Sequence, residues 1–330
     1  MQGISEARVG EILDAARGVR VLVVGDLMLD RYIAGAVDRI SPEAPVPVVR
    51  VDDESYAVGG AGNVAAQVVA LGATCDVVGI VGDDEAGALL RQALVEQGVE
   101  VHGLVATRER PTTTKIRVLA RRQQIVRVDR ERDEDVAPDL ARELAGAVRE
   151  LASGCAAVAL EDYNKGVLVE PVIAAGLGRD GSHALPSVVD PKRIRFFEYR
   201  GATVFKPNAK ELADALSDHL HPEDEAWMEH VRVRMECDHL LLTLGERGMA
   251  LQTASGEYVR VPAVAREVFD VSGAGDTVTA VMAVCLAAGA TPVEGALLAN
   301  HAAALEVGKV GVATVGPDEI LGHHREAANR

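Results

Sequence analysis

Short apolar runs alternate with helical patterns along most of this chain, and this alternation restricts the possible folds more than any other feature. The first run, Val19 to Val24, is rich in β-branched residues and ends at Gly25-Asp26, which we expect to lie in a polar loop. Runs of this kind are typical of parallel strands that helices cover on both faces. The sequence therefore predicts an α/β fold with a central, mostly parallel sheet, helices on both faces and right-handed crossovers.

The same pattern places the other elements. Further strands are expected at Cys75 to Val81, Val99 to Val105, Ala156 to Leu160, Pro186 to Asp190, Thr203 to Phe205 and His239 to Leu244. Helices are expected to end near Gly18 and Leu71 and to span Asp84 to Gln97, Pro138 to Ala152, Val169 to Gly176, Asn208 to Leu216, Pro222 to Met235, Thr277 to Ala288 and Pro292 to Val307. No Pro/Ser/Gly-rich spacer divides the chain, so we expect residues 1–330 to form one domain.

Two extended segments interrupt this alternation. Residues 36–57 hold Pro42, Pro45 and Pro47 before a series of valines, and residues 111–130 combine β-branched with basic side chains. Because proline cannot donate a hydrogen bond to a neighbouring strand, such segments belong at the edge of a sheet. We expect them to form a small β lid over the strand ends, which would exclude water from a reactive group.

The stretch Asp270 to Thr277 carries two glycines and follows a strand-like segment, Tyr258 to Val261 and then Val264 to Phe269. A long apolar helix comes after it. The first N–H groups of a helix have no intrahelical acceptor, and the helix dipole favours an anion beside them. Asp276 would repel that anion unless it takes up a proton, so the stretch suggests a general base beside an oxyanion cradle. A capped helix start with a tight glycine turn is the alternative.

Polar side chains also follow four of the expected strands. These groups are Glu161 to Gly166, Asp190 to Lys192, Lys206 to Glu211 and Thr243 to Gly248. Because the carboxyl ends of parallel strands share one edge of a sheet, they indicate one cleft. Lys165 and Lys192 could neutralise phosphate there, and Asn208 with Glu211 could hold a hydrated Mg²⁺. Each of these residues could instead serve as a helix cap or a surface ion pair.

Two earlier groups are candidates for binding a sugar. Asp30 could accept hydrogen bonds from hydroxyl groups, or could simply pair with Arg31 or Arg39 on the surface. Gly59 and Gly60 would let a ligand approach the backbone, and Asn63 offers both a donor and an acceptor. A plain glycine-rich turn is the alternative for this second group.

Composition limits the partners. Acidic residues outnumber basic ones 50 to 34, giving a formal charge of −16, which argues against nucleic acid or an anionic membrane as the main partner. The longest apolar run, Val278 to Ala290, is too short to span a bilayer, and the N-terminus has no apolar signal-peptide core. We therefore expect a cytoplasmic protein that acts on small molecules.

Together these motifs resemble the PfkB (ribokinase-like) family of sugar and nucleoside kinases. The likeness covers nearly the whole chain through Gly59 to Asn63, Asn208 to Glu211, Thr243 to Gly248 and Gly273 to Asp276. Within that family, residues 25–32, 39–48, 112–119, 206–208, 270–277 and 299–303 look like the D-glycero-β-D-manno-heptose 7-phosphate kinases. Those enzymes phosphorylate the anomeric O1 to give the 1,7-bisphosphate, a step toward nucleotide-activated heptose. Many of them carry an adenylyltransferase domain after the kinase, and from the end of this chain we expect the kinase alone.

The resemblance implies a role for each motif. Asp276 would be the base, and Gly273, Ala274 and Gly275 would form the cradle for the phosphoryl group. The sugar would contact Asp30, Gly59, Gly60, Asn63, Lys165 and Lys192. ATP would contact Asn208, Glu211, Thr243, Gly245, Gly248 and Asn300, with Mg²⁺ held indirectly through Asn208 and Glu211. The sugar's own phosphate would need Lys115, Arg117 or Lys165, among which the sequence does not choose, and exposed lid strands suggest a homodimer.

Some features depart from the family pattern, and other functions compete. Phe205 stands where a smaller aliphatic residue is expected, and Asn164 replaces a usual glycine near the sugar site. Another kinase of the family, acting on a different sugar, sugar phosphate or nucleoside, would share every family motif. A dinucleotide-dependent oxidoreductase is disfavoured, since Gly25-Asp26-Leu27 follows the first strand where G-x-G-x-x-G is required.

Overall fold

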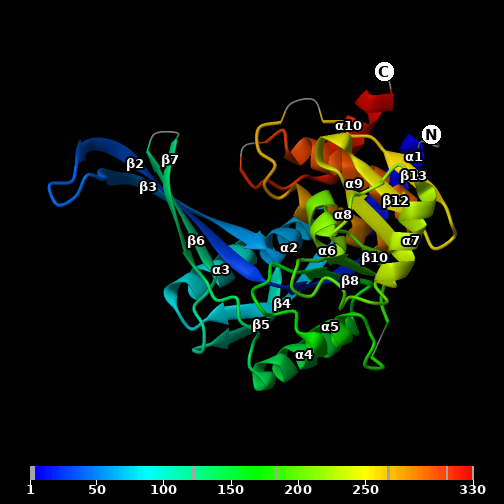
Figure 1. Cartoon of the computed structure of the whole chain (residues 1–330), viewed down its shortest axis with the longest axis horizontal. Coiled ribbons are helices and arrows are strands. Elements are labelled where there is room, and N and C mark those ends of the chain that lie inside the picture. Colours follow the sequence, from blue (N-terminus) through cyan, green and yellow to red (C-terminus); the bar gives the residue numbers. More distant parts are fainter. Residues whose placement is uncertain (1–3, 121–122, 183, 266–267, 310, 329–330) are drawn as a thin grey trace.

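A nine-stranded sheet forms the body of the molecule in the computed structural model, which describes residues 4–120, 123–182, 184–265, 268–309 and 311–328 (Figure 1). The strand order is β13-β12-β11-β10-β9-β8-β1-β4-β5, and every pair from β11 to β5 is parallel. The strands are β1 (Arg20–Gly25), β4 (Thr74–Gly82), β5 (Glu100–Thr107), β8 (Ala157–Glu161), β9 (Ser187–Asp190), β10 (Val204–Phe205), β11 (His239–Thr243), β12 (Met249–Gln252) and β13 (Tyr258–Val261). The predicted α/β class is confirmed.

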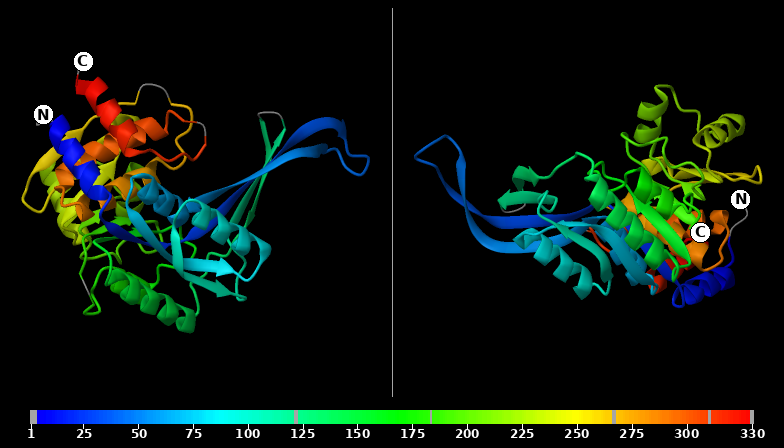
Figure 2. Two further views of the ribbon diagram at one scale, coloured as in Figure 1. Left: turned by 180° about the vertical axis from the view of Figure 1, so that it is seen from behind. Right: turned by 90° about the horizontal axis from the view of Figure 1, so that it is seen from below.

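Helices cover both faces of this sheet (Figures 1 and 2). One apolar core joins the sheet to α1 (Glu6–Ala16), α2 (Ala61–Ala70), α3 (Glu85–Glu96), α8 (Ala274–Ala287), α9 (Pro292–Glu306) and α10 (Pro317–Ala328). The other core joins it to α4 (Pro138–Ala152), α5 (Glu170–Gly176), α6 (Ala209–Leu216) and α7 (Glu225–Met235). In α4 the buried Leu140, Leu144 and Val148 follow one another at four-residue spacing, so a single stripe faces the sheet. No helix among the described residues is both long enough and apolar enough to cross a bilayer.

A second, four-stranded sheet projects from the body, as both views in Figure 2 show. Its order is β3-β2-β6-β7, with β2 (Leu27–Ile40), β3 (Pro47–Gly60), β6 (Thr114–Ala120) and β7 (Gln123–Arg130). β2 is buried at Leu27 and exposed at Ile40, so the strand runs from the core out into solvent. As the prolines indicated, β3 is an edge strand. We call this element the small sheet. Its strands begin at residue 27, earlier than the expected residue 36, and residues 121–122 of its second segment lie outside the described chain.

The prediction of a polar loop after the first strand is wrong. Asp26 is buried, and β2 begins at the next residue. Its carboxylate accepts backbone N–H groups from Tyr163, Lys165 and Val167 at 2.8, 2.9 and 3.2 Å. These bonds tie the end of β1 to the loop after β8, and they satisfy a carboxylate that would otherwise be buried without partners.

Two further differences lie in the C-terminal half. Of the strand expected at Val264 to Phe269, the described residues are not in a strand, and residues 266–267 lie outside the described chain. Among the described residues, β13 is the last strand at this edge of the sheet. The hairpin strand β12 and the helix α10 were not anticipated from the sequence.

Local structure accounts for the two departures from the family pattern. Asn164 has a φ of 54°, in the left-handed region where glycine is common and asparagine is the next best residue. Phe205 is buried and meets Phe196 edge-to-face, with ring centroids 5.1 Å apart. Backbone geometry therefore explains Asn164, and packing explains Phe205.

Candidate active site

Asp276 lies in the first turn of α8 and is the centre of the site. Its carboxylate accepts a hydrogen bond from Asn63 Nδ2 at 2.7 Å and another from the Tyr163 hydroxyl at 2.9 Å. Burial raises the pKa of Asp276 to about 6, although both hydrogen bonds lower it. A carboxylate with such a pKa is ionised at neutral pH and is still basic enough to take a proton.

Gly273 is the residue before α8 and turns the chain into the helix with a φ of 94°. A Cβ atom at this position would lie 3.1 Å from both Asn63 Nδ2 and Glu306 Oε1. Glycine therefore adopts the positive φ that this turn requires, and its lack of a Cβ atom leaves room for Asn63 and Glu306. The N–H groups of the first turn, from Ala274 onward, lie where a helix start binds an anion.

Two lysines lie beside this cradle. Lys206, which follows β10, is buried, and its Nζ atom is 2.9 Å from Asp190 Oδ2. Lys192 Nζ is 3.2 Å from the other Asp190 oxygen. Burial by itself would raise the pKa of Asp190, but these lysines hold it below its usual value. A Cβ atom on Gly275 would be 3.7 Å from Lys206 Nζ, so this ammonium lies next to the cradle.

Glu161, at the end of β8, completes a cluster of carboxylates. Glu161, Asp190 and Asp276 each place an oxygen within 4.8 Å of the others, and neither oxygen of the buried Glu161 has a hydrogen-bond partner among the described residues. Burial, followed by Asp190 and Asp276, raises the pKa of Glu161 well above its usual value. Carboxylate oxygens are the ligands that Mg²⁺ prefers, so this donor set is compatible with a hydrated Mg²⁺ beside the phosphate groups.

Asn208 and Glu211 form a capping box at the start of α6. The Asn208 side chain accepts the Glu211 N–H at 2.9 Å, and Glu211 Oε2 accepts the Asn208 N–H at 2.8 Å. The other Glu211 oxygen is 2.7 Å from Lys192 Nζ. Asn208 and Glu211 therefore do cap a helix, which is the alternative that the sequence left open. Lys192 also links the Glu211 carboxylate to Asp190, because its ammonium contacts both.

The other residues expected to bind ATP lie at neighbouring strand ends. Thr243 pairs with Asn208 in an isolated parallel bridge, and Gly245 to Gly248 form the turn that follows it. A Cβ atom on Gly248 would lie 2.1 Å from the Val261 carbonyl oxygen, which excludes any larger residue. The side-chain amide of Asn300 on α9 donates a hydrogen bond, at 2.8 Å, to the carbonyl oxygen of Pro262, which follows Val261. These contacts place Thr243 beside Asn208, and Gly248 and Asn300 beside the end of β13.

The residues expected to bind sugar fall into two groups. Asn63 contacts Asp276, whereas Asp30 lies at the base of the small sheet and pairs with Arg117. A Cβ atom on Gly59 would be 2.7 Å from Asp30 Oδ2, and one on Gly60, with a φ of 58°, would be 2.3 Å from the Asp26 carbonyl oxygen. The chain itself therefore requires both glycines.

Lys165 is not part of the lysine pair beside the cradle. Its Nζ atom is 2.9 Å from Glu131 and 2.6 Å from Asp133, two carboxylates of the segment after β7. By contrast, Lys192 lies beside Tyr163, with its ammonium 5.2 Å from the centre of the Tyr163 ring.

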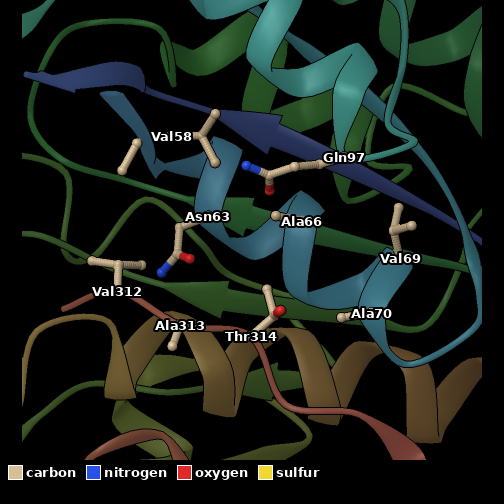
Figure 3. Close-up of a pocket in the computed structure, with 10 residues that line it drawn as sticks. Val58, Asn63, Ala66, Val69, Ala70, Gln97, Val312, Ala313 and Thr314 are labelled. Carbon is tan, nitrogen blue, oxygen red and sulfur yellow. The ribbon is translucent and has the colours of Figure 1, made fainter. Parts of the chain in front are cut away.

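A groove of about 560 Å³ runs along α2 from Asn63 to Ala70 (Figure 3). Val312 to Thr314 form its opposite wall, and Figure 3 shows the Asn63 amide at one end. None of the described residues that line this groove is charged. It can accept the uncharged part of a ligand, but it offers no cation to a phosphate.

Sequence reasoning missed several members of the site. Tyr163 and Lys206 both lie in polar segments that follow strands, so the strand-end rule could have found them. Glu306 carried no such signal, because it lies in the apolar helix α9. Its carboxylate is near Gly273, and burial, followed by Asp270 and Asp276, raises its pKa to about 8.

A buried carboxylate at a helix N-terminus, with two lysines that follow adjacent strands, is typical of an enzyme that transfers phosphoryl groups. The family model for the pfkB family of carbohydrate kinases matches residues 19–319, so the chain belongs to this family and is a sugar kinase.

Curated relatives extend the comparison. The bifunctional protein HldE of Geobacter sulfurreducens is 44% identical over 310 residues, which are 93% of this chain and 63% of that protein. The bifunctional protein HldE of Azorhizobium caulinodans is 47% identical over 305 residues, covering 91% and 63%. The chain thus spans less than two thirds of the length of these relatives.

Solved structures share the fold. Arabidopsis thaliana ribokinase complexed with ribose and ATP superposes with a TM-score of 0.71 at 22% identity, covering 93% of this chain and 99% of that one. Phosphofructokinase-2 from Escherichia coli in complex with potassium gives 0.77 at 20% identity, covering 94% and 99%. The chain therefore has the ribokinase-like fold.

Proposed function

We propose that this kinase transfers the γ-phosphoryl group of ATP to the anomeric O1 of D-glycero-β-D-manno-heptose 7-phosphate, giving the 1,7-bisphosphate for nucleotide-activated heptose synthesis. The observation that carries the phosphoryl-transfer step is the buried Asp276 between Asn63 and Tyr163 at the cradle. The choice of heptose rests on residues 25–32 and 39–48 and on the identity with the HldE proteins. The alternative is a kinase of the same family with a different acceptor.

Proton transfer and charge stabilisation are the two tasks of the chain in this reaction. Asp276 takes the proton of the O1 hydroxyl as that oxygen forms a bond to the γ-phosphorus, while the bond to the β,γ-bridging oxygen breaks and ADP leaves with the electron pair. The N–H groups of Ala274, Gly275 and Asp276 bind the developing charge, and Lys206 adds a fixed positive charge beside them.

Asn63 and Tyr163 hold the base in place, so its orientation is set before the substrate arrives. ATP would lie along Asn208, Thr243, Gly245, Gly248 and Asn300. A hydrated Mg²⁺ near Glu211 and the carboxylates of Glu161, Asp190 and Asp276 would neutralise phosphate charge when bound.

The described residues also support a proposal for the assembly. The small sheet would close over the strand ends as a lid on a single kinase domain of residues 1–330, working in the cytoplasm with ATP. Its outer strands β3 and β7 are unpaired edges within the described chain and expose Val46, Val51, Val126 and Val128 nearby. Such edges are natural pairing surfaces, and a homodimer through the small sheet would cover them.

A coupled ADP-release assay with MgATP tests the acceptor. The panel contains D-glycero-β-D-manno-heptose 7-phosphate, its α anomer, sedoheptulose 7-phosphate, fructose 6-phosphate, ribose and adenosine. We expect turnover only with the β-heptose phosphate. Turnover confined to another member would preserve the kinase chemistry and reject the heptose assignment.

A further inference from the structure

The small sheet presents two arginines on the face that carries Asp30. In the strand register, Asp30 of β2 lies opposite Lys115 of β6, and Lys115 lies opposite Asp129 of β7. Two residues further along, Tyr32, Arg117 and Arg127 form the next row across the same three strands. Side chains two residues apart on a strand share a face, so both rows point to the same side. Arg117 and Arg127 are therefore direct cross-strand neighbours one row beyond Asp30.

This face is continuous with the groove beside α2. Ala57 lies opposite Asp30 in the register of β2 and β3, so the two side chains point to the same side of the small sheet. Ala57 also lines the groove that reaches Asn63, whose amide contacts Asp276. An acceptor whose O1 lies at Asp276 would extend past Asp30 toward Arg117.

The arginine pair keeps donors available for a ligand. Arg117 uses Nη1 to bind Asp30, and its guanidinium lies 5.3 Å from the centre of the Tyr32 ring. Arg127 uses Nε and Nη2 to bind Asp129 at 2.8 and 2.6 Å. Each guanidinium has five N–H donors, so several remain unused within the described chain.

Lys115 and Lys165 have fewer donors to spare, because each ammonium has three N–H groups and contacts two carboxylates. Lys115 Nζ lies 3.7 Å from Asp129 and 3.0 Å from Glu131, and Lys165 Nζ binds Glu131 and Asp133. Both lysine side chains are only 14% exposed. The groove beside α2 has no charged lining among its described residues. A phosphate at the far end of the acceptor is therefore best matched by the arginines.

We propose that Arg117 and Arg127 bind the phosphate group that the acceptor sugar already carries, and that this contact makes the kinase prefer phosphorylated acceptors. The inference rests on the proposed function and specifies how that site reads its substrate. Guanidinium groups suit this role, because their planar donors bind phosphate oxygens in pairs. The phosphate would also join the small sheet to the body through the substrate.

The test compares acceptors that differ only in that phosphate. For the wild type, Arg117→Gln and Arg127→Gln, kcat/KM is measured with the heptose 7-phosphate and with the same heptose lacking the phosphate. We expect each variant to lower the ratio of the two values about tenfold to a hundredfold, mainly through KM for the phosphorylated sugar. Arg50→Gln is the control, because Arg50 is an exposed arginine of the same sheet that pairs with Asp38. Its ratio should stay at the wild-type value.

The outcomes separate the two proposals. If the wild type prefers a different phosphorylated sugar, the heptose assignment fails, and the ratio is measured with that sugar and its unphosphorylated form. Equal losses with both acceptors, or an unchanged ratio in both variants, would overturn the arginine site even if the heptose is the true acceptor. A wild type that accepts only unphosphorylated sugars would also overturn it. Thermal unfolding of each variant confirms that the fold is kept.

Discussion

The body and the outer strand of the small sheet, β7, differ in how they hold charged residues. In the body, Asp276, Asp190 and Lys206 are buried, and Asp276 contacts Asn63 and Tyr163 from distant parts of the chain. In β7 every residue is exposed, and Asp129 pairs with Arg127 two residues away and with Lys115 on the neighbouring strand. Buried charges depend strongly on their partners, whereas exposed pairs contribute little to stability. We infer that the body carries the chemistry and that the small sheet adapts the enzyme to its acceptor.

The largest expected effect is on Asp276, in the body. Asp276→Asn keeps the shape of the side chain but removes the base, so kcat should fall by about 10²- to 10⁴-fold while ATP binding stays near normal. Steady-state ADP release and equilibrium ATP titration measure the two quantities. A variant that retains wild-type kcat would remove Asp276 from the role of base.

Lys206 tests whether a buried charge contributes more to the unfolding free energy than an exposed one. Lys206→Met leaves Asp190 buried with only Lys192 as its lysine partner, so we expect a loss of about 3 kcal/mol in unfolding free energy and a lower kcat. Urea denaturation measures the first effect. The control is Lys210→Met, since Lys210 is exposed and pairs with Asp214 on the same helix, and it should change stability by less than about 0.5 kcal/mol. Equal losses in the two variants would contradict the role given to burial.

The pH dependence tests the environment of the base. Asp276 must be ionised to accept a proton, so kcat should fall about tenfold for each pH unit below its pKa of about 6 and level off above it. The Tyr163 hydroxyl lowers this pKa, so Tyr163→Phe should move the acid limb to higher pH. In Tyr258→Phe, which removes a hydroxyl bound to Pro222, the limb should not move. A limb unchanged in Tyr163→Phe would show that this hydrogen bond does not set the pKa.

The smallest effect on stability is expected in the small sheet. Val126 is exposed on β7, so Val126→Lys should change the unfolding free energy by less than about 0.5 kcal/mol but should dissociate the proposed dimer. Sedimentation velocity reports the oligomeric state. The matched control is Val233→Lys on α7, an exposed valine of the body. Loss of the dimer in both variants, or in neither, would argue against an interface at β7.

Local patterns predicted the elements best. The bounds of α4 agree with the sequence expectation, because a proline start and four-residue apolar spacing are local signals. The polar residues after the strands likewise indicated that these strand ends share one region, and Lys206 after β10 contacts Asp190 at the end of β9. The spacing of Asn208 and Glu211 was ambiguous, since an i, i+3 pair at a helix start serves a capping box as well as a ligand set.

The sequence by itself determined the α/β class, the carboxylate at the start of α8 and the edge position of β3, because each depends on residues that are neighbours in the chain. Only the tertiary structure decided which groups surround that carboxylate. Tyr163 lies 113 residues from Asp276 and Asn63 lies 213 residues away, and their contacts exist only once α2, α8 and the loop after β8 have packed together. The same holds for Asp26, whose partners lie on the loop after the neighbouring strand β8. Local sequence carries the propensity of a segment, but the burial and pairing of its polar groups depend on elements that meet only in the folded chain.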